Sequence, residues 1–398
     1  MKVLGIIAEY NPMHTGHIYH IQKAKELTKS DYVVVVMSGS FTQQGNIAIT
    51  DKFTRAKEAV KNGADLVIEL PTPFSVSDAG CFANKAIQIL NGLNIIDCIC
   101  FGAENNNISL FKNITDILIN NDEEIWSKIK EKLKEGLSFA TARNEVLKRY
   151  LNSEELKIIS SSNNILGLEY VKSLKLTNSS IEAFSILREN NDFNSTKLSS
   201  NYTSSTSIRN VLENNQNTDL LKNYLTKNTY DTLTTLKLLF NNDFFDLLKY
   251  KIISMNLEEI KQINGVTEGF ENKIKKEIID CYDYESYLFK LKSKRYELSR
   301  IKRILVNILL NISKNDFNEL KNDTANYAHI LAFNHEKKEL LSHLSKKANI
   351  PVITNVSYKN TNILNNTQKR LLKFDMYASN IYSILNKSKL NKDYTNML

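Results

Sequence analysis

The fold of this chain is decided by the stretch Ile6-Ile7-Ala8-Glu9-Tyr10-Asn11-Pro12-Met13-His14-Thr15-Gly16-His17-Ile18-Tyr19-His20. It overlaps an apolar run, Val3 to Ile7, that predicts a short buried parallel strand. Asn11-Pro12 is a turn signal, and a helical pattern begins near His17. A strand followed by a turn, a small residue and a helix start is how an open α/β sheet presents backbone N–H groups to the phosphates of a nucleotide.

The histidines of this stretch point to phosphate chemistry. Three of the six histidines of the chain, His14, His17 and His20, fall within seven positions. His14 and His17 would stand at the positive end of the helix, and Gly16 lets a phosphate approach the backbone closely. A metal site is the main alternative, because imidazoles three or four residues apart share a helix face. His14 belongs to the turn, however, and Glu9 is the nearby carboxylate, so phosphate binding is favoured over a metal site or no function.

The pattern His-x-Gly-His after a first strand resembles the signature of the nucleotidylyltransferase superfamily, which includes the class I aminoacyl-tRNA synthetases. The resemblance implies a protein that binds ATP and directs attack on its α-phosphate.

Length and composition are compatible with an enzyme of two domains. The 398 residues are 42% apolar and 24% charged, as in ordinary globular proteins. No run of about 18 apolar residues suggests a membrane span, and the first strand begins so early that we expect no signal peptide. The four cysteines form no disulfide pattern, so we expect buried free thiols and a cytoplasmic protein. A net charge of +8 is compatible with a polyanionic partner.

Further apolar runs predict a Rossmann-like parallel sheet. They cover Tyr32–Met37, Asp65–Leu70, Asp97–Phe101 and Ile181–Leu187, and they alternate with helical segments. In such a sheet the ligand binds at the carboxyl ends of the strands, where the residues following each strand converge. A polar helical insertion is expected at about 105–155.

Other residues of the first half are candidates for phosphate or nucleotide contacts. Asn163 stands at the start of a helix and either caps it or touches the nucleotide. Arg188 follows the last predicted strand, where a cation suits a phosphate. The stretch Ser204 to Arg209 opens a helix with hydroxyl groups that can cap it and bind phosphate oxygens. The candidate phosphate contacts are Lys52, Arg55, Ser205 and Thr206.

Several stretches together resemble one family, the bacterial tRNA(Met) cytidine acetate ligases. They are Gly5–Pro12, Asp51–Lys57, Gly63–Pro71, Asn163–Tyr170, Ser204–Arg209, Glu268–Ile274 and Arg295–Ile301. The resemblance implies that ATP and acetate form acetyl-adenylate, which the N4 amine of the wobble cytidine of elongator tRNA(Met) attacks, giving N4-acetylcytidine and AMP. It also implies an ATP site at Ile7 through His20, Gly102, Asn163 and Arg188. The chain departs from the family pattern at Ala103, where Ser is usual, and at Glu189, where an apolar residue is usual.

The predicted chemistry needs positioned donors more than a side-chain nucleophile. When acetate attacks the α-phosphorus, charge develops on the phosphate oxygens, and His14, His17 and helix-start amides can stabilise it. Cationic side chains and Mg²⁺ bridging the phosphate oxygens would neutralise the triphosphate.

Residues 213–398 are expected to form a mainly α-helical, tRNA-binding domain after a catalytic domain of residues 1–212. Leu298 to Ile312 has the apolar spacing of a helix with one buried face. The candidate tRNA contacts overlap it and are Lys292, Lys294, Arg295, Arg300, Lys302 and Arg303. Such a run is either a solvated helix face or a phosphate-binding surface. Nearby tyrosines either stack on anticodon bases or lie at the edge of the core: Tyr282, Tyr284, Tyr287 and Tyr296.

Three other functions remain open on the sequence. A cofactor adenylyltransferase would not need the basic second half. A nucleotide-sensing RNA-binding protein would bind ATP without releasing diphosphate, and a metal-dependent hydrolase would act without ATP. No membrane partner is expected, and His329, His335 and His343 receive no role.

Overall fold

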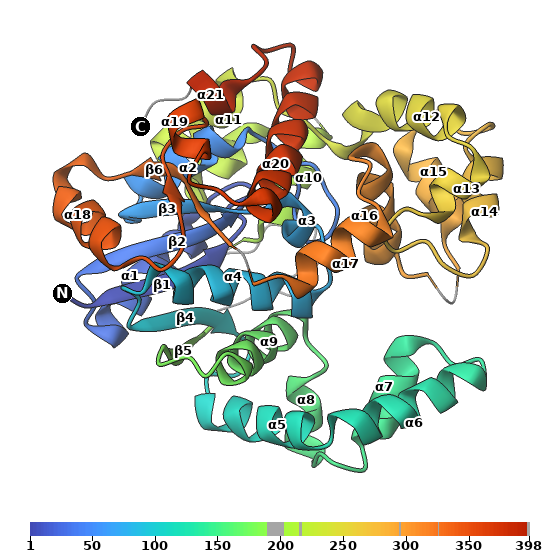
Figure 1. Ribbon diagram of the computed structural model, residues 1–398, viewed down its shortest axis with the longest axis horizontal. Coiled ribbons are helices and arrows are strands. Elements are labelled where there is room, and N and C mark those ends of the chain that lie inside the picture. Colours follow the sequence, from blue (N-terminus) through green and yellow to red (C-terminus); the bar gives the residue numbers. More distant parts are fainter. Residues whose placement is uncertain (189–202, 215–216, 294–295, 325, 396–398) are drawn as a thin grey trace.

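The computed structural model of the chain describes residues 1–188, 203–214, 217–293, 296–324 and 326–395. Within these residues seven strands form one sheet, in the order β5-β4-β1-β2-β3-β6-β7 (Figure 1). The strands are β1 (Val3–Ala8), β2 (Tyr32–Ser38), β3 (Leu66–Leu70), β4 (Cys98–Ala103), β5 (Glu182–Leu187), β6 (Ala328–Phe333) and β7 (Val352–Ile353).

The first five strands are parallel to one another, which confirms the sheet predicted from the apolar runs. β1 lies between β2 and β4, so the strand order reverses there. Ligands of open parallel sheets bind at such a reversal, beyond the carboxyl ends of the strands. The stretch from Glu9 to His20 follows β1 and therefore begins at this position.

Alternation along the strands gives the sheet two apolar faces. Val34 and Val36 of β2 point into one cluster of buried side chains, and Val33 and Val35 point into another. The helices α1 (Thr15–Thr28) and α2 (Lys52–Lys61) pack on the second face. The first face is covered by α3 (Thr72–Ser75), α4 (Ala79–Leu93), α9 (Ser162–Leu176) and α20 (Asn366–Leu385).

The predicted insertion is helical and extends away from the sheet beyond α9 (Figure 1). It consists of α5 (Ile108–Asn120), α6 (Asp122–Lys134), α7 (Phe139–Leu147) and α8 (Ser153–Ile158). Phe111 and Ile114 of α5 are buried, so the base of the insertion belongs to the core.

Helices dominate the second half of the chain. The first of them are α10 (Ser205–Glu213), η1 (Thr218–Asn223), α11 (Lys227–Thr235), η2 (Asn241–Phe244), α12 (Phe245–Ser254), α13 (Leu257–Lys261), α14 (Phe270–Glu277) and α15 (Tyr284–Leu291). They are followed by α16 (Leu298–Leu309), α17 (Lys314–Asn322), η3 (His335–Lys337), α18 (Lys338–Lys347), α19 (Tyr358–Thr361) and α21 (Lys392–Thr395). α16 confirms the predicted amphipathic helix, since Ile301, Leu305 and Ile308 are fully buried.

The sequence did not predict β6 or β7. β6 pairs antiparallel with β3, and β7 pairs parallel with β6, so the second half of the chain extends the sheet of the first half. None of the helices in the described ranges is both long and apolar enough to cross a bilayer. The four cysteines, all within those ranges, are buried free thiols as expected.

Candidate active site

A cavity of about 250 Å³ opens at the carboxyl ends of the parallel strands. Glu9 and His17 reach it from the segment after β1, Gln43 from the loop after β2, Gly102 from β4 and Arg188 from the end of β5. Apolar side chains from α4, β4, α9 and β5 form one of its walls: Phe82, Phe101, Leu166, Tyr170 and Ile186. Residues that the sequence placed at several strand ends therefore meet in one cavity.

The imidazoles of His14 and His17 are oriented by the backbone at the start of α1. His14 is the N-cap residue, and its Nδ1 accepts a hydrogen bond from the backbone N of Gly16 at 3.1 Å. Nδ1 of His17 accepts from the backbone N of His14 at 3.3 Å, and the two rings stack with centroids 3.8 Å apart. Because each Nδ1 is an acceptor, a neutral ring carries its proton on Nε2. Both rings can then donate a hydrogen bond from Nε2.

Burial keeps these imidazoles uncharged. It lowers the pKa of His14 to about 3, and the cationic side chains of Arg188 and Arg209 act in the same direction. Burial, with His14 beside it, also holds the pKa of His17 well below its ordinary value. The pKa of His20 falls to about 4, again mainly through burial. Near neutral pH the rings therefore act as hydrogen-bond donors and not as cations.

A chain of hydrogen bonds orients Asn163 and Arg188 at the opposite rim. The carboxylate of Glu104 accepts from Nδ2 of Asn163 at 2.6 Å and from Oγ of Ser161 at 2.8 Å. Oδ1 of Asn163 accepts from Nη1 of Arg188 at 3.3 Å. A Cβ atom at Gly102 would lie 3.1 Å from Cγ of Arg188, so the glycine leaves room for that side chain. Asn163 thus faces the cavity, and Ser161 is the N-cap residue of α9.

The start of α10 is fixed to the loop after β1. Oγ of Ser205 donates to the carbonyl of Pro12 at 3.0 Å, and Arg209 donates to the carbonyl of Asn11 and to Oγ1 of Thr206. Ser205, Thr206 and Arg209 line the cavity. Arg209 ends the stretch Ser204 to Arg209 that the sequence marks as a candidate, but neither its side chain nor that of Glu104 could be assigned to the site before the loops are brought together.

Not every residue of the first stretch reaches the cavity. Its lining includes Ile7, Ala8, Glu9, Tyr10, Asn11, His14, Gly16, His17, Tyr19 and His20. Pro12, Met13, Thr15 and Ile18 lie behind this wall. Met13 is buried, and the backbone N of Thr15 donates to the carbonyl of Tyr224 at 2.8 Å. Met13 and Thr15 therefore hold the loop and the start of α1 in place.

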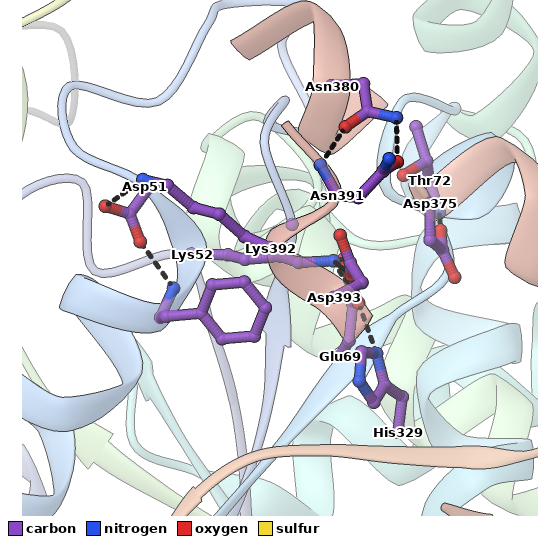
Figure 2. A network of polar contacts seen from close by, with 12 residues as sticks. Asp51, Lys52, Glu69, Thr72, His329, Asp375, Asn380, Asn391, Lys392 and Asp393 are labelled. Carbon is purple, nitrogen blue, oxygen red and sulfur yellow. Dashed lines mark hydrogen bonds and ion pairs between the residues drawn. The ribbon is translucent and has the colours of Figure 1, made fainter. Parts of the chain in front are cut away.

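Lys52 does not contact phosphate, which corrects the prediction made from its sequence position. Its Nζ donates to both carboxylate oxygens of Glu69, at 2.8 and 2.7 Å, and to Asp393 at 2.5 Å (Figure 2). The Lys52 side chain is 1% exposed. His329 completes the group through a 2.9 Å contact with Glu69. Because the ammonium group stands among these carboxylates, it satisfies them and cannot reach the nucleotide.

Arg55 likewise serves the protein backbone and not a phosphate. Its guanidinium donates to the carbonyls of Glu9 at 2.7 Å, Ser38 at 3.1 Å and Gly39, and its Nε donates to the carbonyl of Thr50 at 3.2 Å. Arg55 is buried. It therefore ties together the segments that follow β1 and β2, which form the floor of the cavity.

The candidate tRNA contacts differ in their exposure and in their hydrogen-bond partners. Lys294 and Arg295 lie outside the described residues. Lys292 is exposed, whereas Arg300 donates to Gly265 and Thr267, and Lys302 donates to Asn46, a residue of the cavity wall. Arg303 is partly buried on α16.

Most of the nearby tyrosines belong to the core. Tyr284 and Tyr287 are fully buried and Tyr296 is 5% exposed, so these three cannot stack on an RNA base. Tyr282 is 89% exposed. The structure describes all four of these tyrosines, and Tyr282 is the one among them that is exposed enough to stack on an RNA base.

Comparison with known proteins gives matches over nearly the full length of the chain. Residues 1–396 match the family model described as HIGH Nucleotidyl Transferase. Proteins named tRNA(Met) cytidine acetate ligase from Clostridium botulinum (strain Okra) and Thermoanaerobacter sp. are each 40% identical to this chain. The alignments cover 99% and 98% of this chain and 97% and 96% of those proteins.

Solved structures agree with the sequence relatives. Apo TmcAL of Thermotoga maritima superposes with a TM-score of 0.94 at 31% identity, covering 100% of this chain and 99% of that one. The same enzyme bound with alpha-thio ATP superposes with a TM-score of 0.92, at the same identity and coverage. The chain therefore belongs to the HIGH nucleotidyl transferases and, among them, to the tRNA(Met) cytidine acetate ligase family.

Proposed function

We propose that this enzyme activates acetate with ATP as acetyl-adenylate and transfers the acetyl group to N4 of the wobble cytidine of elongator tRNA(Met), in the cytoplasm. The products are N4-acetylcytidine, AMP and diphosphate. The observation that carries this proposal is the pair of neutral imidazoles, His14 and His17, whose Nδ1 atoms are both held by backbone N–H groups at the start of α1. Such a pair supplies two oriented donors to a phosphate group.

In the first step, an acetate oxygen attacks the α-phosphorus of ATP and the bond to diphosphate breaks. Nε2–H of His14 and His17 would donate to the phosphate oxygens, on which negative charge increases in the transition state. Arg188 and Arg209, which line the same cavity, would attract the triphosphate to these donors. Donors that are already oriented lower the barrier with little reorganisation.

The adenosine would occupy the end of the cavity formed by Gly102, Asn163 and Arg188. This end combines an apolar wall, which includes Phe101 and Leu166, with the oriented amide of Asn163. An apolar pocket with few polar groups is the usual setting for a nucleotide base.

Mg²⁺ would enter with the triphosphate. In nucleotide sites Mg²⁺ keeps several waters and binds largely through the phosphate oxygens, and the described lining of the cavity has too few carboxylates to hold the ion by itself. The residues thus fit an ion held chiefly by the nucleotide. When bound, the ion would neutralise charge on the departing diphosphate.

The tRNA would approach from the side of α16. Lys302 of this helix contacts Asn46 in the cavity wall, so α16 brings at least this cation of the basic run beside the cavity. Residues 213–398 would make most of the tRNA contacts. Residues 1–212 would hold the residues that form acetyl-adenylate. Lysine and arginine side chains would bind the RNA backbone.

The test is exchange of labelled diphosphate into ATP, with and without acetate, followed by mass analysis of nucleosides from tRNA(Met) incubated with enzyme, ATP and acetate. We expect exchange that requires acetate, and a cytidine heavier by one acetyl group. ATP binding without exchange would indicate a nucleotide-sensing RNA-binding protein. Acetate-dependent exchange without modified cytidine would indicate an adenylate-forming enzyme with another acceptor.

A further inference from the structure

Glu9 supplies the one carboxylate among the described residues that line the cavity. It comes directly after β1, and its Oε1 accepts a hydrogen bond from the backbone N of Gln43 at 2.7 Å. Within the described residues, no donor reaches the second oxygen, Oε2. One oxygen is therefore fixed to the loop after β2, and the other remains available to a ligand.

The other polar groups of the cavity are poorly suited to accept a proton. Nδ1 of His14 and of His17 each accept a backbone hydrogen bond, so their Nε2 atoms carry protons. Burial lowers the pKa of His20 to about 4, so its ring takes a proton poorly near neutral pH. Arg188 and Arg209 are donors only. Among the described residues that line the cavity, the free oxygen of Glu9 is thus the group best suited to take a proton.

The second half of the reaction requires such an acceptor. When N4 of cytidine attacks the acetyl carbon, an N–C bond forms and the bond from that carbon to the phosphate oxygen of AMP breaks. The amine begins with two protons and the amide product keeps one. The other proton must leave N4, and the departing AMP phosphate is a weak base.

We propose that Glu9 is the general base of acetyl transfer: its Oε2 binds the exocyclic amine of cytidine and takes the proton that N4 loses as the amide forms. This inference rests on the proposed function, because it requires an acyl-adenylate and an amine acceptor. Glu9 also contributes to base selection. A carboxylate accepts a hydrogen bond from N4 of cytidine, whereas uridine presents an oxygen at the same position and is repelled.

The surroundings of Glu9 suit a base. Burial raises the pKa of its carboxyl group, against the opposing effects of the Gln43 backbone N–H and of Arg209 and Arg55. These cations come from α10 and α2, Tyr170 faces Glu9 from α9, and the imidazoles of α1 are neutral. A carboxylate with a raised pKa takes a proton more readily. The rate of acetyl transfer should therefore rise with pH through the pKa of Glu9 and then level off.

The experiment separates the two half-reactions in the full-length enzyme. Glu9→Gln keeps an oxygen that can accept from Gln43 but cannot take a proton. Acetate-dependent diphosphate exchange reports adenylate formation, and single-turnover mixing of enzyme, ATP and acetate with tRNA(Met) reports acetyl transfer. Glu26→Gln, the same change at an exposed position on α1, is the matched control. We expect Glu9→Gln to slow acetyl transfer about 100-fold and to abolish its rise with pH, while exchange changes less than about threefold.

Two results would overturn the assignment. Acetyl transfer at the unsubstituted rate would show that N4 loses its proton elsewhere. Loss of exchange together with transfer would place Glu9 in nucleotide or magnesium binding. If the unsubstituted enzyme shows no acetate-dependent exchange, the proposed function itself fails, and the inference about Glu9 fails with it.

Discussion

Lys52 and Asp393 form a buried ion pair, although 341 positions separate them in the sequence. Nζ and Oδ1 are 2.5 Å apart, and each side chain is 1% exposed. The same ammonium group binds Glu69 of β3, so α21 is attached to α2 and to a strand inside the sheet (Figure 2). Because Arg55 of α2 holds the strand ends beneath the cavity, Asp393 supports the site without lining it.

Removing Asp393 should destabilise the fold. Asp393→Ala leaves a buried ammonium group with one of its two carboxylate partners, and we expect the free energy of unfolding to fall by about 3 kcal/mol. The neighbouring Lys392 is a suitable control, because its 3.7 Å pair with Asp51 is partly exposed. Lys392→Ala should cost less than about 1 kcal/mol in urea denaturation. Equal losses in the two variants would contradict the role of the buried pair.

Asp375 should make stability depend on pH. Burial, with the Glu69 carboxylate nearby, raises the pKa of Asp375 to about 8. The ordinary pKa of 3.8 applies in the unfolded chain, so between about pH 4 and 8 the folded state holds a proton that the unfolded state has lost. The stability from this group therefore decreases as pH rises through that range, by about 1 kcal/mol per pH unit.

The measurement is urea denaturation at several pH values between 5 and 8, with Asp375→Asn for comparison. Asparagine does not titrate and can still accept from the backbone N of Thr72, as Oδ1 of Asp375 does at 2.6 Å. The stability advantage of the unsubstituted protein over this variant should shrink toward pH 8. A difference that is constant with pH would show that Asp375 is ionised in the folded protein.

His17→Ala should block adenylate formation. The substitution removes one of the two oriented Nε2 donors, and we expect acetate-dependent diphosphate exchange to fall at least about 100-fold. His335→Ala, the same change at an exposed histidine, should leave exchange unchanged. Thermal unfolding checks that both variants are folded. Near-normal exchange by His17→Ala would refute the assignment of this donor.

Glu104→Gln should weaken ATP binding more than it slows the reaction. A glutamine side chain has a single acceptor oxygen for the donors of Ser161 and Asn163, so Asn163 is no longer oriented toward Arg188. We expect KM for ATP to rise about tenfold with kcat nearly constant, since these side chains bind the part of ATP that does not react. Glu182→Gln on β5, an exposed position, is the control. A fall in kcat with KM unchanged would contradict this role.

Replacing Lys292, Lys294 and Arg295 with alanine should weaken tRNA binding and leave ATP binding unchanged. Removing a cation that binds an RNA phosphate lowers both the affinity and its dependence on salt, so the slope of log K against log salt should become shallower by about two. Lys346 and Lys347, exposed on α18, provide a control with a similar loss of charge. Unchanged affinity in the triple variant would move the RNA-binding surface elsewhere.

Much of the central sheet could be predicted because each strand carries its own signal. The apolar runs at β1 to β5 are continuous, as buried parallel strands require, and their predicted bounds lie within two residues of those observed. β6 and β7 could not be recognised in this way. β7 has two residues, and β6 is positioned by pairing with β3, a partner that is more than 250 residues away in the sequence.

The geometry of His14 and His17 is set by their near neighbours in the sequence. His14 caps α1 through hydrogen bonds to residues within three positions, so the sequence alone contains the information for its geometry. Lys52 and Arg55 show the limit of such reasoning. Both are cations on a helix beside the predicted site, and the sequence does not reveal which carboxylates or carbonyls will surround them.

The sequence by itself therefore determined the five parallel strands, the start of α1 and the family, because these depend on short-range patterns of apolar and helix-capping residues. Tertiary structure decided which charges face the cavity and which support it. Lys52 is satisfied by acids 17 and 341 positions away, and Arg55 by carbonyls at the ends of two strands. Glu9 keeps one oxygen that no donor of the described residues reaches. A charged group must find its partner wherever folding places one, since a buried charge without a partner is too costly to persist.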